Sequence, residues 1–164
     1  MDPEKLRREI EDAFRESKRP GDRYLADTMD PVEIERVENI FKGQRWEQWK
    51  DAPSRLWSGK YCQTLCVLSA EAFRYYAPLF MLACIFEYKE AGPLMAGEFL
   101  YLLLPPEYDP GLQGRYENRM RAFSDKQLEV FIKFLNYLKD AHDDNVFGEH
   151  PSRIIPHIKK FLIP

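Results

Sequence analysis

The chain has 164 residues, of which 45% are hydrophobic, 14% aromatic and 31% charged, and its formal net charge is −3. This length suffices for one domain whose core needs neither disulfides nor a structural metal, and the apolar content excludes a disordered chain. The negative charge argues against a general nucleic-acid binder, because such proteins neutralise phosphates with clustered Lys and Arg.

The apolar segments and the cysteines indicate the compartment. The longest nearly charge-free apolar run, residues 75–86, contains Pro78 and is shorter than the roughly 20 residues that span a bilayer, so we expect no membrane partner. The N-terminus is charged from its second residue and lacks the apolar stretch of a secretory signal. Cys62, Cys66 and Cys84 form an odd set in apolar sequence surroundings, which is typical of buried free thiols. We therefore predict a cytoplasmic protein without disulfides.

Charge is distributed unevenly along the chain. Residues 1–60 hold 14 acidic and 13 basic groups, residues 61–110 hold 6 and 2, and residues 111–164 hold 7 and 9. The middle segment is therefore expected to form the core, with charged helices before and after it. We treat residues 1–164 as a single helical domain.

Capping residues mark the first two helices. Asp2 is a typical N-cap residue before Pro3 at the first helical position, and apolar residues follow at helical spacing. Asp30 repeats this signal, and Glu33 has the spacing that completes a capping box. Gly43 is a natural stop for this second helix.

The segment from residue 44 to residue 60 has no regular period. It contains Trp46, Trp49 and Trp57 around a proline and a glycine. This pattern predicts short helical turns whose indoles hold the outer layer against the core.

A buried central helix is predicted over residues 70–86. Ser69 is its N-cap, and Pro78 either kinks the helix or restarts it. The residues after Pro78 are apolar around the whole helix, which is typical of an element enclosed on every side. Leu82 and Ile85 should therefore be buried.

Three further elements complete the predicted fold. Residues 94–104 form an apolar stretch that we interpret as helix, with a strand as the alternative. A capping box at residues 124–127 begins a helix whose apolar stripe runs to Leu138. After a polar loop at residues 142–150, residues 154–162 form a short amphipathic helix. The sequence thus predicts a compact all-α bundle of about six or seven helices.

Two motifs carry a resemblance to a known family. Residues 68–78 read L-S-A-E-A-F-R-Y-Y-A-P, and residues 123–127 read F-S-D-K-Q before F-L-N-Y-L at 134–138. The chain resembles an uncharacterised bacterial family, known only as a domain of unknown function, whose members show L-T-P-E-A-F-R-Y-Y-L-P at the first motif. The similarity spans about residues 10–140. Here Ser-Ala replaces Thr-Pro and Ala77 replaces leucine, and the family supplies no catalytic residue to transfer.

Metal or nucleophile chemistry receives little support from the residue pattern. Cys62 and Cys66 have a spacing that could form half of a zinc site, but no second ligand pair follows. Residues 140–150 contain carboxylates and imidazoles, without the register of a calcium loop. We predict that Cys62, Cys66, His142 and His150 do not form a zinc site, that no other cofactor is needed, and that no residue is catalytic.

A hydrolytic alternative would use Cys66 or Ser69 as nucleophile and His142 as base. This chemistry needs the nucleophile on a strained turn beside the histidine. Neither candidate nucleophile has such a context in the sequence.

Arginines form the remaining candidate features. Arg115, Arg119 and Arg121 with Tyr116 form a small basic patch that we interpret as ordinary surface, although Arg and Tyr are also favoured at binding hot spots. Arg74 lies on the predicted core helix and needs a carboxylate or carbonyl partner. We expect an ion pair with an Asp or Glu of the N-terminal region.

These observations favour a non-enzymatic module that binds a protein partner, such as a bacterial immunity or antitoxin protein that neutralises a basic toxin. The expected surface combines four carboxylates with an exposed indole as apolar anchor: Asp140, Asp143, Asp144, Glu149, and Trp49 or Trp57. The alternative is a cytosolic enzyme whose site is assembled from residues far apart in the sequence. The sequence does not indicate an oligomeric state.

Overall fold

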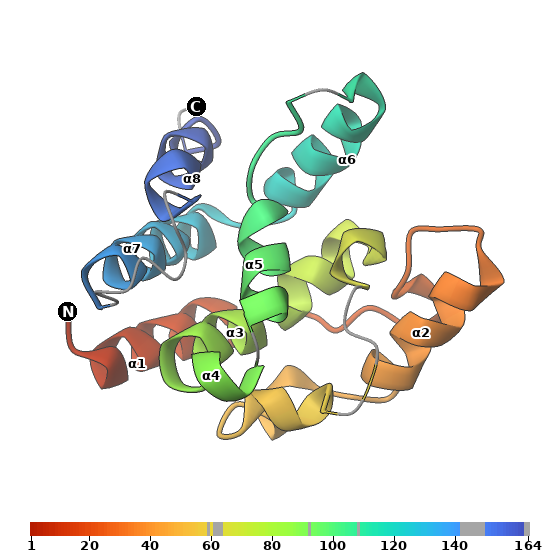
Figure 1. Cartoon of the computed structure of the whole chain (residues 1–164), viewed down its shortest axis with the longest axis horizontal. Coiled ribbons are helices and arrows are strands. Elements are labelled where there is room, and N and C mark those ends of the chain that lie inside the picture. Colours follow the sequence, from red (N-terminus) through yellow and green to blue (C-terminus); the bar gives the residue numbers. More distant parts are fainter. Residues whose placement is uncertain (59, 61–63, 92, 108, 142–149, 163–164) are drawn as a thin grey trace.

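A computed structural model describes residues 1–58, 60, 64–91, 93–107, 109–141 and 150–162. This part of the chain contains helices and no strand, and none of its helices has the length and apolar content that a membrane crossing requires (Figure 1). The α-helices are α1 (Pro3–Phe14), α2 (Pro31–Phe41), α3 (Ala70–Phe86), α4 (Tyr88–Ala91), α5 (Pro93–Tyr101), α6 (Pro110–Arg121), α7 (Asp125–Ala141) and α8 (His150–Lys159). Short 3-10 turns are η1 (Asp22–Tyr24), η2 (Trp46–Gln48), η3 (Pro53–Leu56) and η4 (Leu65–Val67). The predicted all-α fold is confirmed.

Side-chain caps set the starts of several of these helices. Ser69 accepts a hydrogen bond from the amide of Ala72 at the start of α3. At the start of α7, Ser124 and Gln127 form the predicted reciprocal capping box. The capping box expected at Asp30 is wrong, because the Glu33 carboxylate accepts instead from the Thr28 hydroxyl.

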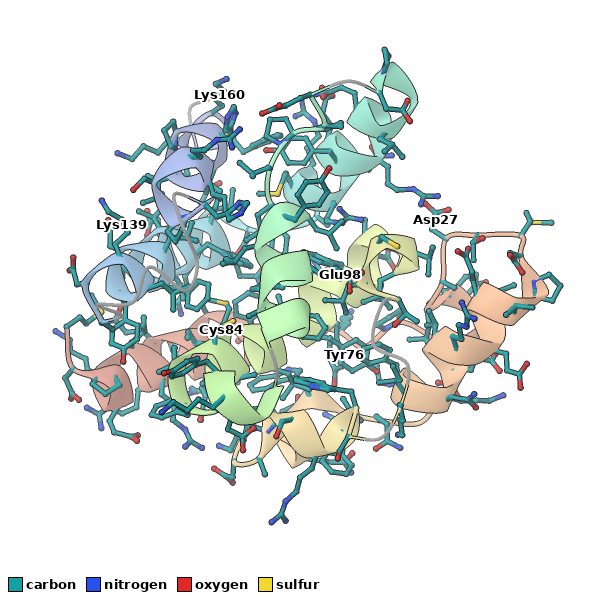
Figure 2. All side chains as sticks on the ribbon, viewed as in Figure 1. Asp27, Tyr76, Cys84, Glu98, Lys139 and Lys160 are labelled. Atoms are coloured by element: carbon teal, nitrogen blue, oxygen red, sulfur yellow. The ribbon has the colours of Figure 1, made fainter. Side chains whose placement is uncertain are left out.

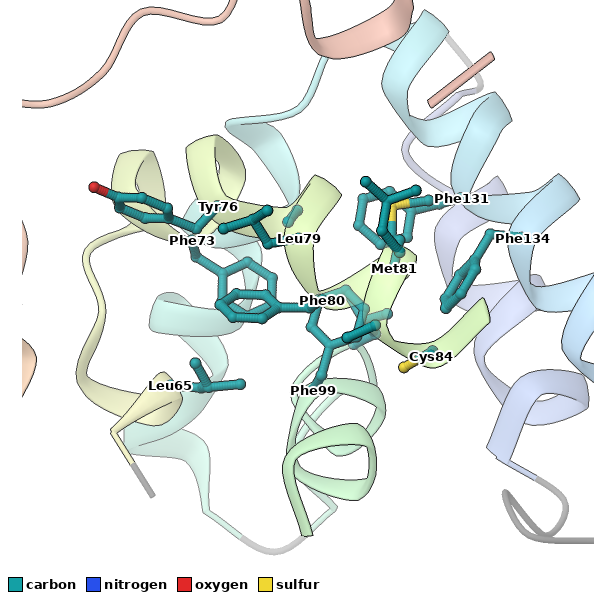
Figure 3. Packing of buried hydrophobic residues seen from close by; sticks show 14 of the residues in the cluster. Leu65, Phe73, Tyr76, Leu79, Phe80, Met81, Cys84, Phe99, Phe131 and Phe134 are labelled. Carbon is teal, nitrogen blue, oxygen red and sulfur yellow. The ribbon is translucent and has the colours of Figure 1, made fainter. Parts of the chain in front are cut away.

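The core is built around α3. Leu82 is fully buried and Ile85 is 7% exposed, as the apolar run predicts. Aromatic rings surround the helix, and Phe80 packs against Phe99 with ring centroids 5.3 Å apart (Figure 3). Helices α1, α5, α6 and α7 all contact α3, which makes it the element that organises the bundle.

Two prolines lie inside helices. Pro78 belongs to one continuous helix, α3, so of the two alternatives, a kink or a restart, the restart does not occur. Pro156 lies within α8, which runs from His150 to Lys159 and so begins four residues before the predicted start at residue 154. The stretch after residue 93 is helical, so the strand alternative for residues 94–104 is wrong.

The loop between η1 and α2 is joined to the segment before α3. Ser69 donates its amide to the Leu25 carbonyl at 2.9 Å, and Asp27 donates its amide to the Val67 carbonyl at 2.7 Å. This contact brings Asp27 beside η4. It also places two segments that are 40 residues apart next to Arg115 of α6, where the candidate site lies.

Candidate ligand-binding pocket

A cavity of about 310 Å³ opens between the end of α5, the chain that follows it and one face of α6. Its wall is mainly apolar and is formed by Tyr101, Leu102, Leu104, Pro106 and Leu112. Arg115, Tyr116, Arg119 and Cys66 supply its polar groups. We call this cavity the Arg119 pocket. A mainly apolar hollow with a few polar groups is the usual form of a binding site.

Arg119 is the most buried cation of the pocket, with only 4% of its surface exposed. Its two terminal nitrogens donate to the carbonyls of Leu102 and Cys66 at 3.3 and 3.4 Å. Its Cζ atom lies 4.7 Å from the centroid of the Phe73 ring. Among the described residues, Nε–H has no acceptor and no carboxylate forms an ion pair with this guanidinium. Burial and the nearby Arg115 lower the pKa of Arg119 to about 10, so it remains charged at neutral pH.

Tyr116 supplies a second unsatisfied group in the pocket. The residue is 5% exposed, and its hydroxyl has no hydrogen-bond partner among the described residues. Burial, with a contribution from Glu117, raises the pKa of Tyr116 to about 12, so the hydroxyl remains a donor at neutral pH. Tyr116 and Arg119 are three residues apart on α6 and therefore share a face of the helix.

The other charges nearby already have partners. Arg115 donates to the Asp27 carbonyl at 2.8 Å, and its Nε lies 3.6 Å from the Asp27 carboxylate. Glu98, on the side of α5 that faces η4, accepts from the Cys66 amide at 3.4 Å (Figure 2). Burial raises the pKa of Glu98, although the Cys66 and Leu65 amides and Arg119 oppose this shift. Arg119 is thus the cation of this group that lacks a close anion among the described residues.

Cys66 lies at the edge of the pocket, and its surroundings differ from the prediction. It is exposed, because η4 turns Leu65 and Val67 toward the core in its place. Its carbonyl accepts from both Arg115 and Arg119 at 3.4 Å. Desolvation and the carboxylates of Glu98 and Glu33 raise the pKa of its thiol, so the thiolate needed for nucleophilic attack is disfavoured.

The predicted acidic surface is described only at its first residue. Asp140 is exposed near the end of α7. Asp143, Asp144 and Glu149 lie outside the described residues, so the structure does not bring the four carboxylates together or separate them.

The expected indole anchors are not free on the surface. Trp57 is only 3% exposed, and its ring packs 5.8 Å from that of Phe80, so the expectation of an exposed Trp57 is wrong. Trp49 is half-buried and donates its Nε1–H to the Gln44 side chain at 3.0 Å. Both indoles serve the contact between the outer segment and the core, which the irregular sequence pattern had also suggested.

The other candidate site residues are also dispersed. Cys62 and His142 lie outside the described residues, and His150 begins α8. The described residues contain no group of three or more ligands able to hold a metal ion. The Ser69 hydroxyl donates to the Tyr24 carbonyl at 2.7 Å while it caps α3, so it links the two segments.

Arg74 has a carbonyl partner in place of the expected carboxylate. It donates to the Ala122 carbonyl at 3.1 Å, and no ion pair of Arg74 is found among the described residues. It lines a second, more polar hollow between α1 and the start of α7. There Asp12 pairs with Lys126 and Arg15, so the charges of this hollow largely satisfy one another.

The sequence predicts an exposed patch at Arg115, Tyr116, Arg119 and Arg121, and for Tyr116 and Arg119 this prediction is wrong, because they are 5% and 4% exposed. A sequence signal for their burial exists. Leu112, Tyr116, Arg119 and Phe123 follow the spacing of an apolar helical stripe, so Arg119 occupies a position where a core residue is expected. A lone arginine in such a stripe indicates a buried cation.

The model of one protein family, described as a family of unknown function (DUF6714), matches residues 2–153. No curated protein and no solved structure matches the chain with significance. The match extends over nearly the whole domain, including both motifs and the Arg119 pocket. The chain therefore belongs to the family of unknown function DUF6714.

Proposed function

We propose that this protein is a non-enzymatic module that binds a protein partner stoichiometrically, and that the Arg119 pocket and its rim form the docking surface. The observation that carries the proposal is the pair of unsatisfied buried donors, Arg119 Nε–H and the Tyr116 hydroxyl, in an apolar pocket. Buried donors without acceptors cost free energy, and a partner that supplies acceptors removes this cost.

The rim of the pocket supports a protein partner. Tyr101 and Leu112 line the pocket, yet they are 64% and 47% exposed. Exposed apolar side chains grouped around a concave site are typical of a contact surface, and Tyr and Arg are enriched at hot spots. The docking surface thus combines an apolar rim with a buried cation.

The pKa values in the pocket favour binding over acid–base turnover. A general acid or base works best when its pKa lies near the working pH. The pKa of Arg119 is about 10 and that of Tyr116 about 12, so both act as hydrogen-bond donors at neutral pH. The thiol of Cys66 is likewise held protonated by its surroundings.

One observation favours the alternative of an enzyme. Residues from η4, α5 and α6, which are far apart in the sequence, meet around the pocket, and the carboxyl group of Glu98 beside them has a raised pKa. A sequence-distant enzyme site would have this origin. Turnover of a small molecule that depends on Glu98 would support this alternative over the binding proposal.

In its most specific form, the proposal makes the partner a toxin and this chain its bacterial immunity or antitoxin protein. The net charge of −3 favours encounter with a basic partner, and Asp140 is exposed to contribute to that attraction. The docking surface differs from the one expected from the sequence. Trp57 is buried and cannot contact a partner, whereas the Arg119 pocket has an exposed rim.

The test is co-expression with the protein encoded by the neighbouring gene, followed by native mass spectrometry and a measured Kd. We expect a complex of fixed stoichiometry that Leu112→Glu weakens by at least about tenfold. Val32→Glu is the matched control, because Val32 is 53% exposed and lies on α2 away from the pocket lining. Equal Kd values for the two variants would contradict the proposed surface, and the absence of a complex would contradict the proposed partner.

A further inference from the structure

We propose that the Arg119 pocket recognises the C-terminal carboxylate of a partner chain together with the apolar side chain of its last residue. This inference rests on the proposed function and gives the chemistry of the contact. It starts from Arg119, a cation that is 4% exposed and has no carboxylate ion pair among the described residues. A buried charge of this kind is normally paired, because the uncompensated charge is costly.

The arrangement of donors fits a carboxylate. Two of the five N–H groups of the guanidinium donate to carbonyls, at the long distances of 3.3 and 3.4 Å, and Nε–H has no acceptor among the described residues. Arg presents its donors as a planar fork that matches the two oxygens of a carboxylate. Tyr116, three residues earlier on the same face of α6, also lines the pocket, and its buried hydroxyl has no hydrogen-bond partner among the described residues.

The neighbouring charges favour an anion with a single charge. Arg115 is already paired with Asp27, and the Glu98 carboxylate accepts a hydrogen bond from the Cys66 amide next to the pocket. A doubly charged phosphate would meet the repulsion of Glu98, while Arg119 is the one cation among the described pocket-lining residues that has no ion pair to balance it. A carboxylate neutralises Arg119 without an excess of negative charge.

The apolar wall points to a chain end as the source of the carboxylate. A terminal carboxylate is joined to the same Cα as the last side chain, so both groups enter a pocket together. Leu102 and Leu104 would contact that side chain while Arg119 binds the carboxylate. Arg119 is almost fully enclosed, so an acidic residue inside a partner chain could reach it only if the chain on both sides of that residue crossed the rim at Tyr101 and Leu112. At a chain end, only one strand of the partner has to cross the rim.

The test uses two peptide probes that differ only at the C-terminus: acetyl-Gly-Gly-Gly-Leu as the free acid and as the amide. Binding is measured by titration followed in ¹H–¹⁵N NMR spectra, including the Arg side-chain Nε–H region. We expect the acid to bind at least about tenfold more tightly than the amide and to shift the Arg119 Nε–H signal. Equal binding of acid and amide, or no binding of either, would overturn the proposal.

Variants assign the preference to the pocket. Arg119→Gln should reduce the acid-to-amide ratio of affinities to about one, whereas Arg121→Gln, on the exposed side of the same helix, should preserve it. Tyr116→Phe removes only a hydroxyl that has no partner among the described residues, so this variant should fold. Its affinity for the peptide acid should nevertheless be lower than that of the wild type. An unchanged ratio in both Arg119→Gln and Tyr116→Phe would place the site elsewhere. If Arg119→Gln does not fold, the two wild-type titrations and Tyr116→Phe decide the result.

Hexanoate as a third probe distinguishes a chain end from a free organic acid. Tighter binding of hexanoate than of the peptide acid would overturn the assignment to a chain end. The peptide measurements need no natural partner, so they test the carboxylate assignment independently of the proposed protein-binding function. Acid selectivity without a complex in the co-expression experiment would contradict the proposed function alone. A complex without acid selectivity would contradict the carboxylate assignment alone.

Discussion

At the scale of single residues, Glu98 is expected to make stability depend on pH. Burial raises the pKa of its carboxyl group above the ordinary value near 4.5, so the folded state holds this proton more tightly than the unfolded state does. The contribution of Glu98 to stability is therefore largest at low pH and is lost as the pH rises through the folded pKa. In urea melts at several values between about pH 4 and 7, Glu98→Gln should gain stability relative to the wild type as the pH rises.

Glu11→Gln is the control, because its effect on stability should change with pH in the opposite direction. Burial raises the pKa of Glu11, but hydrogen bonds from Lys50 and Arg7 outweigh this effect and lower it. The Glu11 carboxylate therefore stabilises the fold above its unfolded pKa, and this stability is lost as the pH falls. Glu11→Gln should lose stability relative to the wild type as the pH rises. A difference for Glu98→Gln that is constant with pH would show that its carboxyl group is not perturbed.

Leu82 tests the core position that the apolar run predicts. Its side chain is fully buried in the middle of α3, so Leu82→Ala removes packed methyl groups and leaves a cavity. We expect a loss of about 2–5 kcal/mol in the free energy of unfolding, measured by denaturant melts. Val32→Ala, at a residue that is 53% exposed, should change it by less than about 0.5 kcal/mol. A loss below about 1 kcal/mol for Leu82→Ala would contradict a central α3.

At the scale of elements, Ser69 connects the start of α3 to the loop after η1. Its hydroxyl accepts from the Ala72 amide at 3.1 Å and donates to the Tyr24 carbonyl at 2.7 Å. Ser69→Ala removes both bonds, and we expect a loss of about 1–2 kcal/mol in denaturant melts. Ser69→Thr keeps the hydroxyl and should lose less.

The matched control is the cap of α2. Asp30 accepts from the Val32 amide at 2.9 Å in an exposed setting, so Asp30→Ala removes a cap without the second bond. We expect this loss to be about 0.5–1 kcal/mol. Should Ser69→Ala cost no more than Asp30→Ala, the bond to Tyr24 contributes nothing to stability.

At the scale of the whole molecule, the helices should unfold together. α1 contacts both α3 and α7, and α8 contacts α7 and α5, so no pair of helices in the described part of the chain has a core of its own. The three tryptophans lie between residues 46 and 57, and their fluorescence reports the packing of that segment on the core, whereas far-UV circular dichroism reports all helices. We expect coincident urea transitions by both methods. A dichroism change that leaves fluorescence unaltered would reveal separate unfolding of helices that do not pack on the tryptophan segment.

Local features of the sequence were sufficient for much of this fold. Caps such as Asp2, Ser69 and Ser124 act on amides two or three residues away, so their effect is visible in the sequence itself. The apolar run after Pro78 predicted the enclosure of Leu82, because a helix without a polar face must be covered on all sides.

Only the tertiary structure decided the candidate site. Arg119 is buried because η4 and the end of α5 pack on its face of α6 and offer the carbonyls of Cys66 and Leu102, which are 53 and 17 residues away. The burial of Trp57 and the exposure of Cys66 were likewise set by which neighbours each residue meets after folding. Periodicity determines which residues share a helix face, but the partners of that face come from distant segments, and a single sequence does not encode their positions locally.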